Sequence, residues 1–137
     1  MARRLKPAPT VELGRPGEAA GMAAMVAELV RANLADSPSR ARVARRVRGS
    51  IVLLADDRSL GVTLSFGEDG VVIDASPAPG LPVLAGPWLT MATVCAGARS
   101  PLSAVARREL HVEARRPLRA LLAAAYVLKV PRSAGRT

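Results

Sequence analysis

Residues 62–75, VTLSFGEDGVVIDA, decide the fold. Apolar residues occupy every second position from Val62 to Phe66, a spacing typical of a strand with one buried face. The turn sequence 67–70 follows, and a second strand places Val71 and Ile73 on its inner face. Two strands joined by so short a turn form a β-hairpin, so antiparallel pairing is expected at the centre of the fold.

Proline, glycine and serine mark the ends of the other elements. Ser37-Pro38 and Ser100-Pro101 are helix starts with a capping serine and a proline in the first turn, and Gly97 is a helix stop. Helices are expected at 18–34, 38–48, 87–96, 101–108 and from 117, and further strands at 50–55, 81–85 and 109–114. The hairpins among these elements predict an α+β fold with a mixed sheet and helices packed on one face.

The charge of the chain lies mainly at its ends. The formal net charge is +9, and the only three aromatic residues are Phe66, Trp88 and Tyr126. Residues 1–17 contain four basic residues and one acidic residue, and residues 129–137 contain three basic residues and no acidic one. A concentrated basic face and stacking aromatics are missing from the central region, so specific nucleic-acid binding is not expected.

Three segments are predicted from these patterns. Residues 1–17 are expected to be a disordered, basic and proline-rich tail, residues 18–128 the folded domain, and residues 129–137 a basic C-terminal tail. One cysteine and one histidine exclude a zinc ligand set. The single cysteine and the lack of a signal-peptide pattern predict a cytoplasmic protein.

Four stretches together carry a resemblance to a known family. The first is the helix end and strand VRGSIVLLADD (47–57), and the second is the hairpin VTLSFGEDGVVIDA (62–75). The third is the proline-rich link and uncharged helix LPVLAGPWLTMATVCAG (81–97). The last is the helix, strand and helix SPLSAVARRELHVEARRPLRALLAAAYVL (100–128). In this order they resemble the sterol-carrier-protein type of sterol-binding domain over about residues 22–128. The resemblance implies a largely antiparallel five-stranded sheet covered by helices. It also implies an apolar tunnel for sterols, fatty acids or acyl-CoA, gated in part by the C-terminal helix.

A ligand pocket would be lined by apolar residues of the sheet and of the later helices. The expected lining residues are Val62, Leu64, Phe66, Ile73, Leu89, Met91, Val94 and Leu102, and the resemblance implies that Leu118, Leu122 and Tyr126 also face the ligand. An ordinary amphipathic helix stripe fits the last three equally. Small alanines in the last helix favour open space beneath it, and the Tyr126 hydroxyl could meet the polar end of a ligand. A close-packed core of Ala, Val and Leu fits the same composition, so both interiors stay open.

Four arginines flank the last strand. Arg107, Arg108, Arg115 and Arg116 could bind an anionic lipid headgroup or an anionic membrane surface, or they could simply be solvated. Cys95 is expected to be a buried small apolar residue, and His111 lacks the nucleophile motif that a hydrolase needs.

The sequence therefore predicts non-enzymatic binding or transfer of a lipid, without a cofactor or a metal. A protein-interaction module on the same fold with a filled core is the alternative. The oligomeric state stays open.

Overall fold

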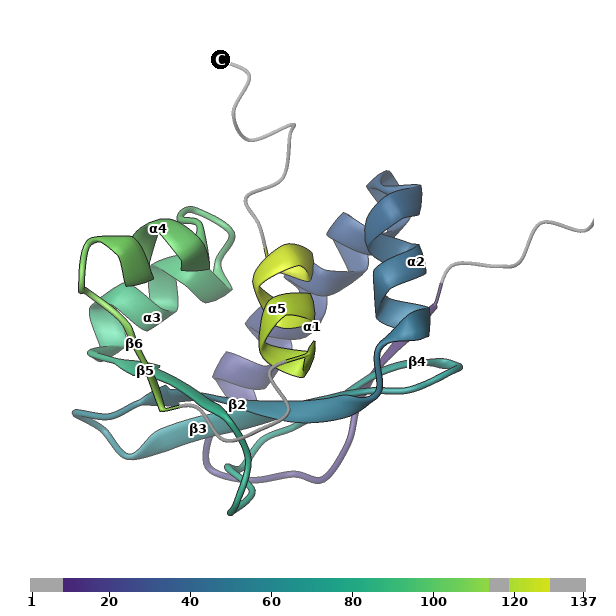
Figure 1. Cartoon of the computed structure of the whole chain (residues 1–137). Helices are drawn as coiled ribbons and strands as arrows, with labels where there is room; N and C mark the ends of the chain where they lie inside the picture. The colour runs from purple at the N-terminus through teal and green to yellow at the C-terminus, as the bar shows by residue number, and fades with distance from the viewer. Residues whose placement is uncertain (1–8, 114–118, 129–137) are drawn as a thin grey trace, which may run out of the picture.

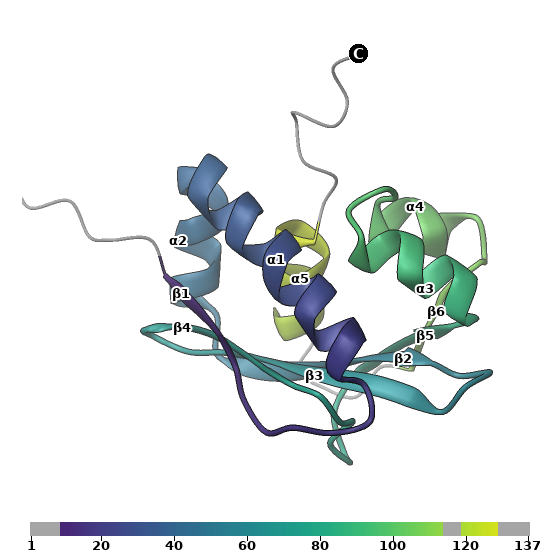
Figure 2. The same cartoon turned by 180° about the vertical axis from the view of Figure 1, so that it is seen from behind.

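The computed structural model describes residues 9–113 and 119–128 of the 137-residue chain. Five helices lie on one face of a single sheet (Figures 1 and 2). The elements are β1 (Thr10–Leu13), α1 (Ala20–Asp36), α2 (Pro38–Arg46), β2 (Gly49–Ala55), β3 (Leu60–Phe66), β4 (Gly70–Asp74), β5 (Val83–Gly86), α3 (Trp88–Cys95), α4 (Pro101–Ala106), β6 (His111–Glu113) and α5 (Arg119–Val127).

The sheet has six strands in the order β1-β4-β3-β2-β5-β6. The pairs β2–β3, β3–β4 and β5–β6 are antiparallel, whereas β1–β4 and β2–β5 are parallel. The predicted hairpin is confirmed: Leu64 pairs with Ile73 on one side and with Ile51 on the other. The α+β class, the mixed sheet and the single helical face are as predicted. The expected count of five strands is wrong, and two of the five strand pairs are parallel in a sheet that was expected to be largely antiparallel.

The additional strand is β1, in the segment expected to be a disordered tail. Val11 is buried beneath the helices, and the Arg15 backbone donates to Asp74 Oδ1 at 2.6 Å and accepts from the Ala75 amide at 3.0 Å. The prediction of disorder is therefore wrong for residues 10–17, which extend the folded domain toward the N-terminus. Residues 1–8 and 129–137, the rest of the two predicted tails, lie outside the described residues.

A side chain of α1 reaches the free side of β1. The amides of Thr10 and Gly14 donate to Asp69 and Ile73 on the β4 side, so the carbonyl of Val11 points away from β4. Arg31 Nη2 donates to that carbonyl at 2.9 Å. This bond ties the middle of the long first helix to the outer side of the sheet.

The helix starts follow the predicted serine-proline signals. Ser37 Oγ accepts from the Arg40 amide at 3.3 Å, and Ser100 Oγ accepts from the Ser103 amide at 3.5 Å. Each serine is followed by proline in the first turn, which has no amide hydrogen to leave unpaired. Gly97 has a φ of 75°, the left-handed conformation expected just after a helix.

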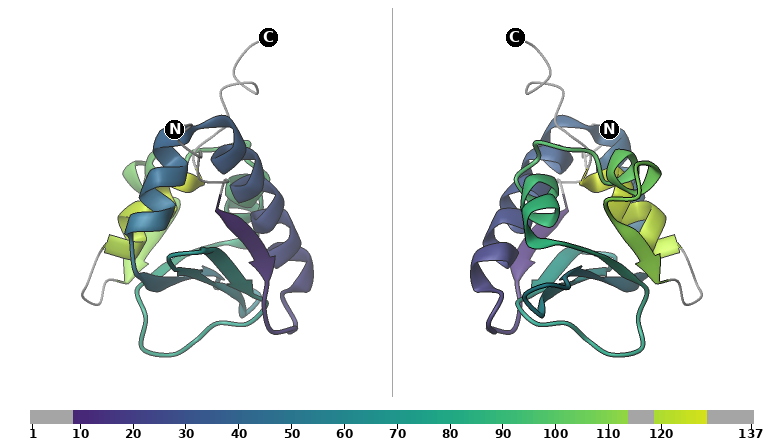
Figure 3. Two further views of the ribbon diagram at one scale, coloured as in Figure 1. Left: turned by 90° about the vertical axis from the view of Figure 1, so that its right-hand side faces the viewer. Right: turned by 90° about the vertical axis from the view of Figure 1, so that its left-hand side faces the viewer.

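The face of the sheet that bears no helix is partly covered by the connection between β4 and β5, which runs beneath it (Figure 3). The Thr63 hydroxyl donates to the Ser76 carbonyl at 2.8 Å and accepts from the Ala78 amide at 3.0 Å. Thr63 lies on the outward face, as the alternation predicted, yet it is only 3% exposed because this proline-rich connection crosses it. The strand after Pro82 begins late, at Val83, and lies between β2 and β6.

Within the described ranges, none of the helices has the length and apolar character needed to cross a membrane.

Candidate ligand groove

An apolar groove opens between α4, α5 and the end of the sheet that carries β6. Its volume is about 90 Å³. Three strands form its floor, and the two helices form its walls. Its lining residues are Ile51, Leu84, Pro101, Leu102, Val105, Val112, Leu122, Ala124 and Ala125.

Two leucines stand at this groove with much of their surface in water. Leu102 on α4 is 60% exposed and Leu122 on α5 is 66% exposed. Exposed leucines are common singly, but two on one apolar groove form a continuous apolar surface from solvent to the sheet. The groove can therefore accept apolar surface from another molecule.

The wall formed by α5 is built from small side chains. Ala120, Ala123 and Ala124 are 2%, 2% and 1% exposed, so alanines make much of the buried side of this helix. Near its start, a Cβ placed on Gly49 would lie 3.5 Å from the Ala120 Cβ, which shows how closely α5 approaches the sheet. Alanines bury little apolar area, so this contact with the sheet contributes less stability than a leucine stripe would.

The other end of α5 is held by polar contacts with α1 and α2, which we call the α5 anchor: Asn33, Ser39, Arg40, Tyr126 and Val127. Asn33 Nδ2 donates to the Val127 carbonyl at 2.7 Å, and Arg40 Nη1 donates to Asn33 Oδ1 at 3.2 Å. The hydroxyls of Ser39 and Tyr126 are 2.8 Å apart, and the Arg40 guanidinium lies 5.7 Å from the Tyr126 ring centroid.

The α5 anchor is deeply placed for so polar a cluster. Asn33 is 0% and Arg40 7% exposed. The helical periodicity of residues 18–34 predicts that Asn33 lies on the same face as Met22 and Leu29. The periodicity of the next helix predicts only that Arg42, Arg45, Arg46 and Arg48 point mostly outward, so it does not predict the burial of Arg40. The only local signal for Arg40 is its position, three residues after the capping Ser37 and four before the buried Ala44.

The structure brings two of the predicted lining residues, Leu102 and Leu122, to the groove. Leu89 lies on the surface of α3 at 78% exposure, and the half-buried Tyr126 directs its hydroxyl to Ser39. Leu118 lies outside the described residues. The other six are fully or almost fully buried in the core: Val62, Leu64, Phe66, Ile73, Met91 and Val94.

Sequence reasoning missed the groove floor. Ile51, Leu84 and Val112 come from three different strands, and only the strand order brings them together. The alternation of residues in each strand indicates that they face inward. It does not indicate which inward residues lie beneath α5.

The predicted headgroup arginines are only partly described. Arg107 and Arg108 are exposed at the end of α4, and Arg108 has a φ of 62°, rare for a residue other than glycine. Arg115 and Arg116 lie outside the described residues. Next to this turn, Arg99 and Glu109 form a two-bond ion pair, whose hydrogen bond holds the pKa of Glu109 below its usual value.

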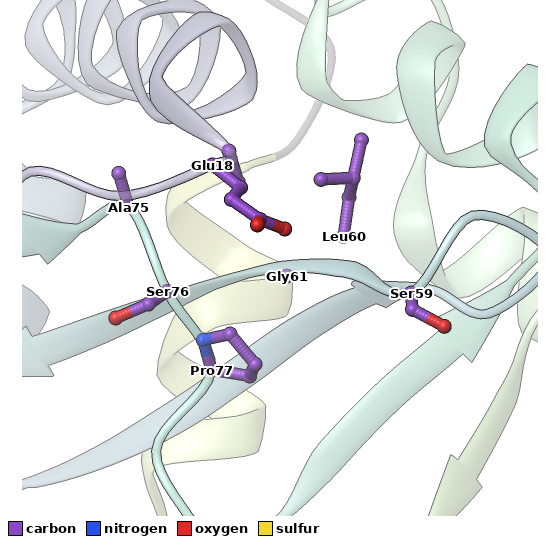
Figure 4. A pocket seen from close by; sticks show the side chains of 8 residues that line it. Glu18, Ser59, Leu60, Gly61, Ala75, Ser76 and Pro77 are labelled. Carbon is purple, nitrogen blue, oxygen red and sulfur yellow. The ribbon is translucent and has the colours of Figure 1, made fainter.

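A second pocket, of about 130 Å³, lies where α1 begins, beside the β2–β3 hairpin (Figure 4). Glu18, Ser59, Leu60 and Pro77 are among its lining residues. An apolar ligand there would strip water from the Glu18 carboxylate, which is costly. The groove beside α5 is therefore the better site for an apolar molecule.

The two residues with catalytic potential lie apart from the groove lining. Burial raises the pKa of the Cys95 thiol to about 12, so the thiolate does not form near neutral pH. His111 is exposed on β6, with Nε2 3.7 Å from Glu113 Oε1. Within residues 9–113 and 119–128, no three His, Cys, Asp or Glu side chains are grouped so as to hold a metal ion.

Comparison with known proteins places the fold. No protein-family model and no curated protein sequence matches the chain. A solved structure described as "UbiJ-SCP2 Ubiquinone synthesis protein" matches with a TM-score of 0.55 and 18% identity, over 80% of this chain and 96% of that one. A crystal structure of sterol carrier protein 2 matches with a TM-score of 0.52 and 21% identity, over 78% and 87% of the two chains. The chain therefore has the sterol-carrier-protein type of fold.

Proposed function

We propose that the protein binds or transfers a lipid, such as a sterol, a fatty acid or an acyl-CoA, in the groove beside α5. The observation that carries this proposal is the apolar groove with Leu102 and Leu122 at its open side. The fold supports it, because one structural neighbour is titled sterol carrier protein 2. Another is titled a ubiquinone synthesis protein, so an isoprenoid lipid is a further ligand to test.

The groove must widen to take such a ligand. At about 90 Å³ it is smaller than the engineered cavity of about 150 Å³ that holds a benzene molecule. We propose that the first turns of α5 move away from the sheet while the α5 anchor holds its last turn. The alanine contacts of Ala120, Ala123 and Ala124 with the sheet bury little apolar area, so separating them would cost little free energy.

Apolar burial supplies the driving force. Each buried methylene group contributes about 0.8 kcal/mol, before the costs of ordering the ligand and of moving α5. A long acyl chain offers enough methylene groups to offset both costs. A short fatty acid does not, so affinity should rise with chain length.

The proposed activity is non-enzymatic and cytoplasmic. The Cys95 thiol, with its raised pKa, is a poor nucleophile, and the exposed His111 lies outside the groove lining. A free thiol fits a reducing compartment.

Displacement of a fluorescent fatty acid tests the proposal. The full chain should bind the probe at micromolar concentration, and unlabelled fatty acid or sterol should displace it. A Leu102→Asp variant should bind far more weakly, whereas Leu13→Asp, the same substitution at an exposed leucine of β1, should bind as the wild type does. If the wild type does not bind the fluorescent fatty acid, and neither unlabelled fatty acid nor sterol binds, the proposal is contradicted.

A protein-interaction module with a filled core is the second candidate. It is favoured by the complete burial of Val62, Leu64, Ile73, Met91 and Val94, each 0% exposed. Native mass spectrometry of the purified protein separates the two candidates. A retained lipid mass supports lipid binding, and a lipid-free protein that also fails in the probe assay supports the interaction module.

A further inference from the structure

Three neighbouring helices present a surface that combines cationic and apolar side chains. We propose that this surface docks on an anionic lipid bilayer, with Arg42 and Arg46 of α2 at the headgroups and Leu102 and Leu122 in the outer apolar layer. We call these four residues the docking surface. The inference rests on the proposed function, because it names the membrane from which the groove would load.

The placement of the arginines follows from helix geometry. Ser39, Arg42 and Arg46 are spaced i, i+3 and i+7, so they lie along one stripe of α2. Arg42 and Arg46 are exposed on it, and the opposite side of the helix buries Ala41 and Ala44.

The same stripe lies next to α5. Ser39 Oγ is 2.8 Å from Tyr126 Oη, which joins the start of α2 to the end of α5. Gly49, just after α2, approaches Ala120 at the start of α5, so the two helices run antiparallel side by side (Figure 1). Leu122 lies one turn before Tyr126, on the same stripe of α5.

The apolar half of the docking surface continues into the groove. Leu122 and Leu102 both line the groove, one from each of its helical walls. A bilayer that contacts them would therefore meet the groove opening directly. Two partly inserted leucines and nearby cations match what anionic bilayers bind, apolar area together with positive charge.

The two arginines are available for such a partner. In the part of the chain that the structure describes, no carboxylate forms an ion pair with Arg42 or Arg46. The sequence of α2, PSRARVARR, contains no acidic residue. Each arginine at an anionic membrane surface strengthens binding by about fivefold.

Vesicle flotation with the full chain tests the docking surface. Wild-type protein should bind vesicles of phosphatidylcholine with 30 mol% phosphatidylglycerol, bind pure phosphatidylcholine vesicles much less, and dissociate as salt is raised. The double variant Arg42→Gln/Arg46→Gln should lose about 25-fold in affinity. Its matched control, Arg15→Gln/Arg58→Gln, removes two exposed arginines that lie before α1 and in the β2–β3 turn, and it should lose less than about fivefold.

The leucines are tested separately from the charge. Leu102→Ser/Leu122→Ser should weaken binding to the anionic vesicles by about tenfold or more, while Leu13→Ser on β1 should leave it unchanged. Circular dichroism establishes that each variant is folded.

Four outcomes would overturn the inference: no vesicle binding by the wild type, equal losses in both arginine pairs, no loss in the leucine pair, or binding of duplex DNA in place of vesicles. Displacement of the fluorescent fatty acid, measured without vesicles, tests the proposed lipid binding separately from docking on the membrane. If the wild type binds the probe but not the vesicles, the docking surface is wrong and the lipid site stands. If it binds vesicles through the four residues but no probe, the lipid site is wrong.

Discussion

Asn33 Nδ2 donates a 2.7 Å hydrogen bond to the carbonyl of Val127, joining residues 94 positions apart in the chain. The same side-chain amide also accepts a hydrogen bond, because its oxygen, Oδ1, accepts from Arg40 Nη1. One fully buried side chain thus connects three helices, and the last of them forms a wall of the groove.

Replacing Asn33 should loosen the C-terminal helix. Asn33→Leu removes the donor to the Val127 carbonyl and the acceptor for Arg40, and leaves both groups buried with fewer partners. We expect a loss of about 3 kcal/mol in the free energy of unfolding, measured by urea denaturation. Glu28→Gln, on the exposed side of the same helix, should change it by less than about 0.5 kcal/mol. An Asn33→Leu variant with the same free energy of unfolding as the wild type would show that the buried hydrogen bonds do not stabilise the fold.

Gly70 is required for the pairing of β1 with β4. Its φ is +158°, and a Cβ there would lie 2.0 Å from the Thr10 carbonyl oxygen. Gly70→Ala should therefore destabilise the protein by about 2–4 kcal/mol and speed hydrogen exchange at the Gly14 amide, which bonds to Ile73.

The opposite end of the same turn supplies the control. A Cβ on Gly67 would meet nothing closer than 3.8 Å, so Gly67→Ala should cost far less. Equal effects of the two substitutions would argue against the close approach of Thr10 to Gly70.

Filling the groove should block the ligand without unfolding the protein. Ala125 is half-buried and lines the groove, so Ala125→Leu places extra methyl groups in the space proposed for lipid. The Kd for the fluorescent fatty acid should rise by about tenfold or more, while the melting temperature falls little. Ala106→Leu, at an exposed position of α4 outside the groove lining, should bind as the wild type does. Unchanged binding by Ala125→Leu would place the ligand elsewhere.

The buried thiol should make stability fall in mild alkali. Burial raises the pKa of Cys95 from 9.0 to about 12, so above pH 9 the unfolded chain loses its thiol proton while the folded chain keeps it. Ionisation then favours the unfolded state, and the free energy of unfolding should fall by about 1.4 kcal/mol between pH 8 and pH 10 from this group.

Comparison with a variant isolates that contribution. Cys95→Val lacks the thiol, so its stability should decline less over the same range by about that amount. Parallel declines in the two proteins would show that Cys95 is accessible to water.

The order of the elements was predictable because its signals are local. Ser37 and Ser100 cap helices through bonds to amides three residues away, and the hairpin turn lies within four residues. β1 was not predictable in this way. It has four residues with one buried side chain, Val11, and its partner strand lies far along the chain.

The candidate site was likewise predictable from the sequence only in part. Leu102 and Leu122 belong to apolar helix patterns, and those patterns found them. The burial of Arg40 depends on where α5 meets α2, and the burial of Thr63 depends on the connection that crosses it. Neither the burial of Arg40 nor that of Thr63 produces a periodic pattern in the sequence.

The bond from Arg31 to the Val11 carbonyl has a consequence for the protein at high concentration. A β-strand of another molecule that added to the outer side of β1 would use that carbonyl as a hydrogen-bond acceptor. The guanidinium already bonds to it at 2.9 Å and lies on the side from which such a strand would approach. One arginine of the first helix therefore hinders strand addition at this border of the sheet.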